Sequence, residues 1–317
     1  MTGKEAEAAR VLMRTSSPDA EQPSDAAPEL ARSSSDVVPT LADLNLPWPK
    51  VTVVIPTLNE ARNLPHVFAK LPQGLHEVIV VDGNSVDDTV ATARSLRPDV
   101  RVITQNRSGK GNALACGFAA ATGDVVAMVD ADGSADPAEI PQFVQALLDG
   151  ADFAKGTRFA QGGGSCDITH LRRLGNWALS TLVNVLCRTK YSDLCYGYNV
   201  FWRHHVPVFG LDVQQDIPVG SGTRLWGDGF EVETLINIRI AQAGLKVKEV
   251  PSYEHSRIHG VSNLNATSDG WRVLRTIIAE RYYYRQRKVH GEPASPGSPL
   301  RWQRRALSEF VSSRRSK

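Results

Sequence analysis

The stretch VVAMVDADGSAD, from Val125 to Asp136, indicates both the class of fold and the chemistry of the chain. Its first five residues are apolar, which is typical of a buried strand. Asp130 and Asp132 follow with one alanine between them, so an extended backbone points both carboxylates to the same side. Adjacent carboxylates repel each other unless a cation lies between them, and Mg²⁺ and Mn²⁺ prefer such oxygen ligands. The pattern therefore predicts a site for a metal ion and a diphosphate.

A solvated turn is the alternative interpretation of this acidic pair. Gly133 and Ser134 favour a turn, and Asp136-Pro137 favours the start of a helix. An isolated pair of this spacing is more often such a turn. Its position directly after an apolar strand, together with the segments that precede it, favours the metal site.

Upstream of this stretch, strand-like and helix-like segments alternate with short connections. This alternation predicts a parallel, doubly wound α/β sheet. Ligands bind outside the carboxyl ends of the strands in such sheets, and Asn59, Glu60 and Asp82 follow two of those ends. Asn59 is also expected to cap a helix that runs to Leu71. We expect strands at 51–55, 77–81, 101–104 and 125–129, and further helices at 87–96 and from 110.

The second half of the chain has a less regular pattern. Three glycines at 162–164 predict a flexible loop, and 253–257 predicts a polar loop. We expect strands at 151–154, 198–202 and 246–250, and helices at 171–187, from 227 and at 271–284.

The composition is that of a globular chain with two unusual ends. With 317 residues, 42% of them hydrophobic, the chain can bury a substantial core. Residues 1–48 are rich in Ala, Ser, Pro and acidic residues, which predicts a disordered tail. Residues 281–317 carry ten Lys/Arg and two Glu, so this end is strongly basic although the whole chain is only +2. We therefore expect a folded domain at 49–280 between a disordered tail at 1–48 and a basic tail at 281–317.

The sequence predicts a cytoplasmic protein. It lacks a basic-then-apolar signal pattern, and no window approaches the roughly 20 apolar residues of a spanning helix. Its four cysteines show no metal or disulfide spacing, which favours a reduced setting. The basic tail predicts peripheral contact with an anionic membrane at about 1 kcal/mol per Lys/Arg, with an ordinary solvated tail as the alternative. No nucleic-acid module accompanies the charge, so no nucleic acid is expected as a partner.

Several segments resemble the inverting, family-two nucleotide-sugar glycosyltransferases. These segments are, in order, VVIPTLNE, VVDGNSVDDT, GKGNAL, VDADGSADP, KGTRF, GYNVF, GFEVETLI and EVPSYEHSRIHGVSNL. They cover about residues 50–270, and the branch they most resemble is that of the dolichol- or polyprenyl-phosphate sugar transferases. The resemblance implies the GT-A fold, in which one half binds the nucleotide sugar and an irregular half binds the acceptor.

The same resemblance implies a role for individual residues. Those implied to bind the nucleotide are Pro56, Asn59, Glu60, Asp82, Lys110 and Asp130. Those implied to hold Mn²⁺ or Mg²⁺ on the diphosphate are Asp130 and Asp132. Those implied to meet donor or acceptor phosphates are Arg158, Arg172 or Arg173, and Arg257. Arginine suits this task because its planar fork binds phosphate oxygens bidentately.

The chain departs from the resembled branch in two ways. Ser134 stands where many members have Gln, so a metal ligand is missing or replaced. His255 is the candidate replacement, because a His in the matching loop binds metal in some GT-A enzymes, including retaining glucosyl-phosphoglycerate synthases. The alternative is a loop imidazole bonded to Glu254 or to backbone. The second departure, the lack of C-terminal membrane helices, weakens the prediction of a lipid acceptor.

The acceptor decides which residues catalysis would need. We expect in-line displacement at the anomeric carbon of a UDP- or GDP-sugar. A hydroxyl acceptor needs a general base, for which Asp228 and Glu231 are candidates. The competing interpretations are a helix N-cap for Asp228 and a helix-dipole contact in the first turn for Glu231. A phosphate acceptor, with a second pKa of about 6, is already ionised and needs cations.

Four functions therefore remain open. The first is a metal-dependent inverting transferase acting on a polyprenyl phosphate. The second is a transferase, inverting or retaining, acting on a small-molecule or natural-product hydroxyl. The third is a sugar-phosphate nucleotidyltransferase, which is disfavoured because residues 56–60 are not a Gly-rich phosphate loop. The fourth is a non-catalytic binder of nucleotide sugars.

Overall fold

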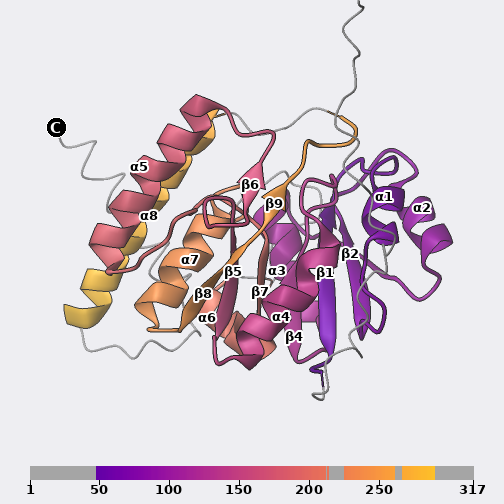
Figure 1. Cartoon of the computed structure of the whole chain (residues 1–317), viewed down its shortest axis with the longest axis horizontal. Coiled ribbons are helices and arrows are strands. Elements are labelled where there is room, and N and C mark those ends of the chain that lie inside the picture. Colours follow the sequence, from indigo (N-terminus) through magenta and orange to yellow (C-terminus); the bar gives the residue numbers. More distant parts are fainter. Residues whose placement is uncertain (1–47, 212, 214–224, 261–265, 290–317) are drawn as a thin grey trace, which may run out of the picture. The chain divides into compact units, whose positions relative to one another are not determined.

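The fold is built on a seven-stranded sheet in the order β3-β2-β1-β4-β7-β5-β8 (Figure 1). The computed structural model describes residues 48–211, 213, 225–260 and 266–289. The strands of the sheet are β1 Val51–Thr57, β2 Glu77–Asp82, β3 Arg101–Thr104, β4 Val125–Met128, β5 Phe153–Thr157, β7 Asn199–Trp202 and β8 Val247–Pro251. The α-helices are α1 Leu64–Ala69, α2 Thr89–Leu96, α3 Lys110–Ala120, α4 Ile140–Leu148, α5 His170–Cys187, α6 Val206–Phe209, α7 Val232–Gln242 and α8 Ala266–Val289.

The sheet is mostly parallel. β3, β2, β1 and β4 pair in parallel, and so do β5 and β8, whereas β7 is antiparallel to both of its neighbours, β4 and β5. The register pairs Thr57 with Asp82 and Asp82 with Thr104, so the first three strands end at one edge. The structure thus confirms the α/β class, and the carboxyl ends of these strands carry the residues predicted for the site.

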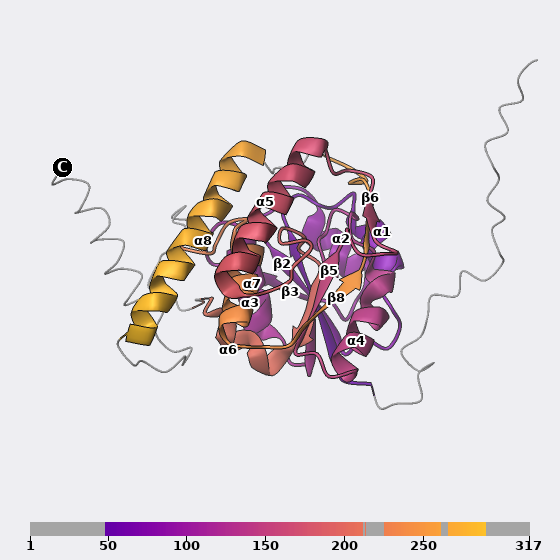
Figure 2. The same cartoon turned by 60° about the vertical axis from the view of Figure 1, so that its left-hand side comes forward.

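Helices cover both faces of the sheet because side chains alternate along each strand. On β1, Val53 points into a core shared with α1 and α4, while Val54 points into a core shared with α3 and α7. A third cluster joins Val183 of α5 and Ile277 of α8 to α7. The two long helices α5 and α8 therefore form an outer layer over α7 (Figures 1 and 2).

Several element boundaries differ from those expected. Asn59 does not cap a helix: α1 begins at Leu64 with Asn63 at its N-cap position, and ends at Ala69 rather than Leu71. Asn59 has φ 58°, and its side-chain oxygen accepts a hydrogen bond from Val86 N at 2.8 Å. The helix expected from residue 227 begins at Val232, and the helix expected at 271–284 runs from 266 to 289.

The ends of the chain largely lie outside the described residues. This holds for the disordered tail expected at 1–48, apart from residue 48, and for 290–317 of the expected basic tail. Across the described helices, none is both long enough and apolar enough to span a bilayer. All four cysteines are free thiols.

Candidate active site

The two predicted metal-binding carboxylates follow β4, and each is paired with a cation from another part of the chain. Lys110, the first residue of α3, places its Nζ 2.7 Å from Asp130 Oδ1. Arg257, in the loop after β9 (Tyr253–Glu254), places Nη2 2.9 Å from Asp132 Oδ2. The structure therefore brings four of the predicted site residues into two contacts at one edge of the sheet.

Lys110 is held by two carboxylates rather than one. Its Nζ also lies 2.8 Å from Glu233 Oε1 in the first turn of α7. Burial alone would lower the pKa of the Lys110 amine, but Asp130 and Glu233 outweigh burial and raise that pKa. Sequence reasoning missed Glu233, although it lies in the quoted motif GFEVETLI two residues after Glu231.

Arg257 joins the loops that follow β1 and β4. Its Nη1 lies 3.1 Å from Glu60 Oε1, while its Nη2 binds Asp132. Glu60 also accepts a hydrogen bond from Asn63. Burial raises the pKa of the Glu60 carboxyl, and Asp132 adds to this, although Asn63 and Arg257 act in the opposite direction. Protonation of Glu60 is therefore easier here than in water.

Backbone contacts fix the acidic turn against the loop after β9. His255 N donates to Ser134 O at 2.8 Å, and Ile258 N donates to Asp132 O at 3.2 Å. Gly133 has φ 77°, a backbone conformation that favours glycine, and a Cβ there would also have to displace the end of the Ile258 side chain, 2.6 Å away. The Ser134 hydroxyl donates to Asp132 Oδ1 at 2.7 Å and so orients that carboxylate.

The residues predicted to bind metal do not form a ready-made three-ligand site. His255 is exposed, and its ring packs 5.0 Å from the Tyr253 ring. Among the described residues, no group of three His, Cys, Asp or Glu side chains is arranged to hold a metal ion. The carboxylates of Asp130 and Asp132 are nevertheless the hard oxygen donors that Mg²⁺ or Mn²⁺ prefers. They fit such an ion if a bound diphosphate supplies further oxygens.

The residues predicted to bind the nucleoside lie in or next to the loops that follow β1 and β2. Pro56 lies in β1, and Asp82, the last residue of β2, accepts hydrogen bonds from Asn84 N and Ser85 N, each at 3.1 Å. Ser85 Oγ in turn accepts from Asn59 N at 2.9 Å. These bonds order the loops after β1 and β2 side by side, as the strand-end pattern predicts.

Asp228 lies in a buried ion pair that the sequence analysis did not anticipate. Its Oδ2 is 2.8 Å from Arg107 Nε, and its Oδ1 is 2.9 Å from Arg107 Nη2. Leu225 N also donates to Oδ2 at 2.6 Å. Both carboxylate oxygens are thus engaged, and the residue lies before α7 rather than at its N-cap. This arrangement favours a structural role over that of a general base.

Glu231, the other candidate base, is less completely engaged. It occupies the N-cap position of α7, and its Oε1 lies 3.3 Å from Gly227 N and 3.4 Å from Gly229 N. Its Oε2 is buried and makes no hydrogen bond within the described residues, with Arg272 Nε 4.0 Å away. Glu231 therefore retains an oxygen that could accept a proton.

The four predicted phosphate-binding arginines are not equivalent. Arg158 is buried between Asp193, 2.7 Å from its Nε, and Glu254, 2.9 Å from its Nη1. Arg172 and Arg173 lie in the first turn of α5, where Arg172 pairs with Asp167 and the Arg173 guanidinium lies over a phenylalanine ring. Only Arg257 directly contacts the acidic pair, so it is the strongest of the four candidates.

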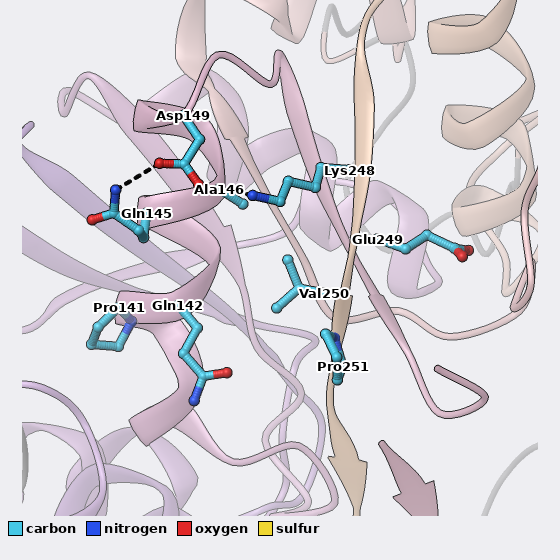
Figure 3. A pocket seen from close by; sticks show the side chains of 9 residues that line it. All are labelled: Pro141, Gln142, Gln145, Ala146, Asp149, Lys248, Glu249, Val250 and Pro251. Carbon is cyan, nitrogen blue, oxygen red and sulfur yellow. Dashed lines mark hydrogen bonds and ion pairs between the residues drawn. The ribbon is translucent and has the colours of Figure 1, made fainter. Parts of the chain in front are cut away.

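A hollow between α4 and β8 lies apart from these residues. Figure 3 shows its lining, which includes Gln142, Val250 and Pro251. At its edge the Lys248 amine forms an ion pair with Asp149 at 2.8 Å. None of the predicted site residues lines it. The candidate site is therefore defined by the strand-end loops and not by this hollow.

Comparison with known proteins agrees with these observations. The sequence model of "Glycosyl transferase family 2" matches residues 52–206. An uncharacterized glycosyltransferase of Mycobacterium tuberculosis (strain ATCC 25618 / H37Rv) is 31% identical over 71% of this chain and 97% of its own length. A dolichol-phosphate mannosyltransferase of Pyrococcus furiosus is 32% identical over 77% of this chain and 65% of its own length.

A solved structure shares the fold. Glucosyl-3-phosphoglycerate synthase from Mycobacterium tuberculosis, in complex with Mn²⁺, UDP and phosphoglyceric acid, superposes with a TM-score of 0.56 at 23% identity. The superposition covers 74% of this chain and 78% of that one. The mostly parallel sheet, the strand-end acidic pair and these relatives together show that the chain is a glycosyltransferase of GT-A fold and belongs to glycosyl transferase family 2.

Proposed function

We propose that the chain transfers a sugar from a UDP- or GDP-sugar to a phosphate-bearing acceptor such as a polyprenyl phosphate, with inversion and with the help of Mn²⁺ or Mg²⁺. The observation that carries this proposal is the pairing of Asp130 and Asp132 with Lys110 and Arg257 at the strand ends. The relative from Pyrococcus furiosus, a dolichol-phosphate mannosyltransferase, supports the class of acceptor. The UDP and Mn²⁺ in the glucosyl-3-phosphoglycerate synthase complex support the class of donor and metal.

Each part of the site has a task in this reaction. The loops ordered by Asp82 and Asn59 would bind the nucleoside, and Asp130 and Asp132 would hold the divalent cation. That cation, when bound, would neutralise charge on the leaving nucleoside diphosphate. Lys110 can bind a phosphate oxygen of the donor from α3, and Arg257 can bind phosphate from the opposite side of the acidic pair.

The state of the candidate bases favours a phosphate acceptor. Asp228 is neutralised by Arg107, so it is poorly placed to remove a proton from a hydroxyl. An acceptor phosphate, with a second pKa of about 6, carries its negative charge at neutral pH and needs no base. Inversion then follows from a single in-line attack on the anomeric carbon.

A hydroxyl acceptor is the second candidate, and one observation favours it. Glu231 Oε2 is buried without a hydrogen bond in the described residues, so it could accept a proton. Under that alternative, Glu231→Gln should abolish transfer. Under the phosphate-acceptor proposal, the same variant should keep transfer within about tenfold of wild type.

The experiment is a transfer assay with a panel of UDP- and GDP-sugars, with Mn²⁺ or Mg²⁺, in the presence and absence of a polyprenyl phosphate. Wild type is compared with Asp132→Asn and with Asp99→Asn, an exposed aspartate paired with Arg97 outside the site. We expect metal-dependent transfer to the lipid that Asp132→Asn loses at least about a hundredfold and Asp99→Asn retains. Transfer only to a soluble hydroxyl acceptor would contradict the proposed acceptor, and the absence of turnover with every donor would contradict the proposed reaction.

A further inference from the structure

The outer helices α5 and α8 carry most of the large apolar side chains that the described residues expose. Seven of the twelve exposed large hydrophobic residues lie on these two helices. They are Leu171, Leu174, Trp177 and Val185 on α5, and Trp271, Ile278 and Tyr282 on α8. Isolated exposed apolar residues are ordinary, whereas a concentration on two adjacent helices marks an interaction surface.

These side chains form stripes that face away from the core. On α8, Trp271, Ile278 and Tyr282 recur at helical spacing, while Val273 and Ile277 on the opposite side pack inward. On α5, Trp177 is 63% exposed, while Val183 is fully buried. The two helices lie side by side over α7 (Figure 2), so their outward sides belong to one face of the molecule, called here the α5–α8 face.

The exposed charges that the structure describes on these two helices all have one sign. α5 contains no acidic residue, and the two acids of α8 are buried: Asp269 pairs with Arg272, and Glu280 pairs with Arg239. Among the described side chains of α5, its C-cap and α8, the exposed charged residues are Arg173, Arg188, Arg275 and Arg285. The described part of the face therefore combines tryptophan, tyrosine and aliphatic side chains with arginine, and neither helix exposes a carboxylate.

We propose that the α5–α8 face docks on an anionic lipid surface. Tryptophan and tyrosine favour the headgroup region of a bilayer, and arginine extends its charged end to lipid phosphates while its apolar stem stays buried. A second copy of the chain fits less well, because a two-fold contact through this face would bring arginine against arginine without an acidic partner.

The α5–α8 face lies close to the candidate active site, so docking on a membrane would bring that site near a lipid acceptor. α5 begins directly after β6 (Gly164–Ser165), which pairs with β9, the strand that precedes the Arg257 loop. Near the start of α8, Arg272 Nε lies 4.0 Å from Glu231 Oε2 in front of α7. Both helices therefore start near the site, and docking would hold the acceptor side against the surface in which a lipid phosphate lies. This purpose rests on the proposed function, whereas the docking itself can be measured without turnover.

The test is co-sedimentation of the full chain with vesicles of phosphatidylcholine, with and without phosphatidylglycerol. The variant is the double change Trp177→Glu and Trp271→Glu, which alters two exposed side chains. The matched control is Leu96→Glu, because Leu96 is 42% exposed at the end of α2, away from this face. A second variant, Arg304→Gln with Arg305→Gln, tests the C-terminal tail.

We expect wild type and Leu96→Glu to bind the phosphatidylglycerol vesicles alike, and the tail variant to retain most of this binding. The double Trp variant should bind these vesicles at least about tenfold more weakly than wild type. Equal binding by wild type and the double Trp variant, or no binding by wild type, would overturn the inference. Loss of binding in the tail variant alone would assign the contact to the tail. A dimer of wild type that dissociates in the double Trp variant would assign the face to a second copy.

Transfer to a water-soluble, short-chain prenyl phosphate separates this inference from the proposed function. If the double Trp variant keeps that activity but loses transfer to lipid in vesicles, both proposals are supported. If vesicle binding depends on the face but no prenyl phosphate is glycosylated, the docking inference stands and the proposed acceptor is wrong.

Discussion

Replacing Asp228 should lower the stability of the protein rather than remove a catalytic base. The side chains of Asp228 and Arg107 are 5% and 2% exposed, and two charged hydrogen bonds of 2.8 and 2.9 Å join them. Asp228→Asn would remove the carboxylate charge that binds the buried guanidinium at two points, which costs about 3–5 kcal/mol. At roughly 2–4 °C per kcal/mol for a domain of this size, Tm should fall by roughly 6–20 °C.

The assay is thermal and urea unfolding of wild type, Asp228→Asn, Arg107→Met and the double variant at pH 7. The double variant removes both members of the ion pair, so its loss should be smaller than the sum of the two single losses by at least about 2 kcal/mol. Asp99→Asn is the matched control, because Asp99 pairs with Arg97 at 3.1 Å while its side chain is 69% exposed. That exposed pair should contribute less than about 1 kcal/mol.

One result would refute this reasoning. Transfer activity is measured at a temperature where every variant is folded. If Asp228→Asn unfolds at the wild-type temperature but turns over at least about a hundredfold more slowly, the carboxylate acts in the chemistry and the ion pair is not its main role.

Three further changes test other parts of the structure. Arg257→Gln removes the cation that lies 2.9 Å from Asp132 Oδ2 and competes with a metal ion for this carboxylate. In a titration without donor, Mn²⁺ should therefore bind to the variant roughly fivefold more tightly, while sugar transfer slows. Weaker Mn²⁺ binding by the variant would contradict the observed pairing. Burial would raise the pKa of the Glu77 carboxyl, but its hydrogen bonds outweigh burial and lower that pKa to about 2. The free energy of unfolding that Glu77 contributes should therefore be present above pH 4.5 and be lost as the pH falls from about 4.5 to 2. In unfolding curves measured over this pH range, Glu77→Gln should abolish that loss. Gly111→Ala would place a Cβ 1.7 Å from a backbone oxygen, so it should lower the free energy of unfolding in urea by about 3 kcal/mol or more. The control is Gly175→Ala on α5, where a Cβ meets open space and should raise the free energy of unfolding by roughly 0.5–1 kcal/mol.

The sequence predicted the elements whose cause is local. The apolar runs before Asp82 and Asp130 have the period and length of buried strands, and the structure places Asp82 at the end of β2 and Asp130 just after β4, on either side of β1. The predicted start of helix α1 was wrong, for a reason that the local sequence does not show. Asn59 can accept a hydrogen bond from the next turn of a helix or from a neighbouring loop, and Val86 N, 27 residues away, provides the second partner.

Roles of the charged residues were predicted less well, because charge pairing depends on distant parts of the chain. Asp228 pairs with Arg107 across 121 residues, and Arg158 pairs with Asp193 across 35. From sequence, these side chains look like a base and a phosphate ligand, because nothing nearby in the chain neutralises them. The tertiary fold supplies the partner, and only the fold shows which arginines and carboxylates remain available for a substrate.

For the proposed reaction, the charges that remain at the site favour joint binding of the donor and the cation. Lys110 and Arg257 contact four carboxylates, those of Asp130, Glu233, Asp132 and Glu60, so two cations face four acidic groups and the formal net charge is −2. A nucleoside diphosphate alone would bring further negative charge to a group that already has an excess. A divalent cation would balance this excess of negative charge, and it would also attract the oxygens of the donor diphosphate into the site. The pairing of the acidic residues with the chain's own cations thus favours a donor that enters with its metal and disfavours one that enters without it.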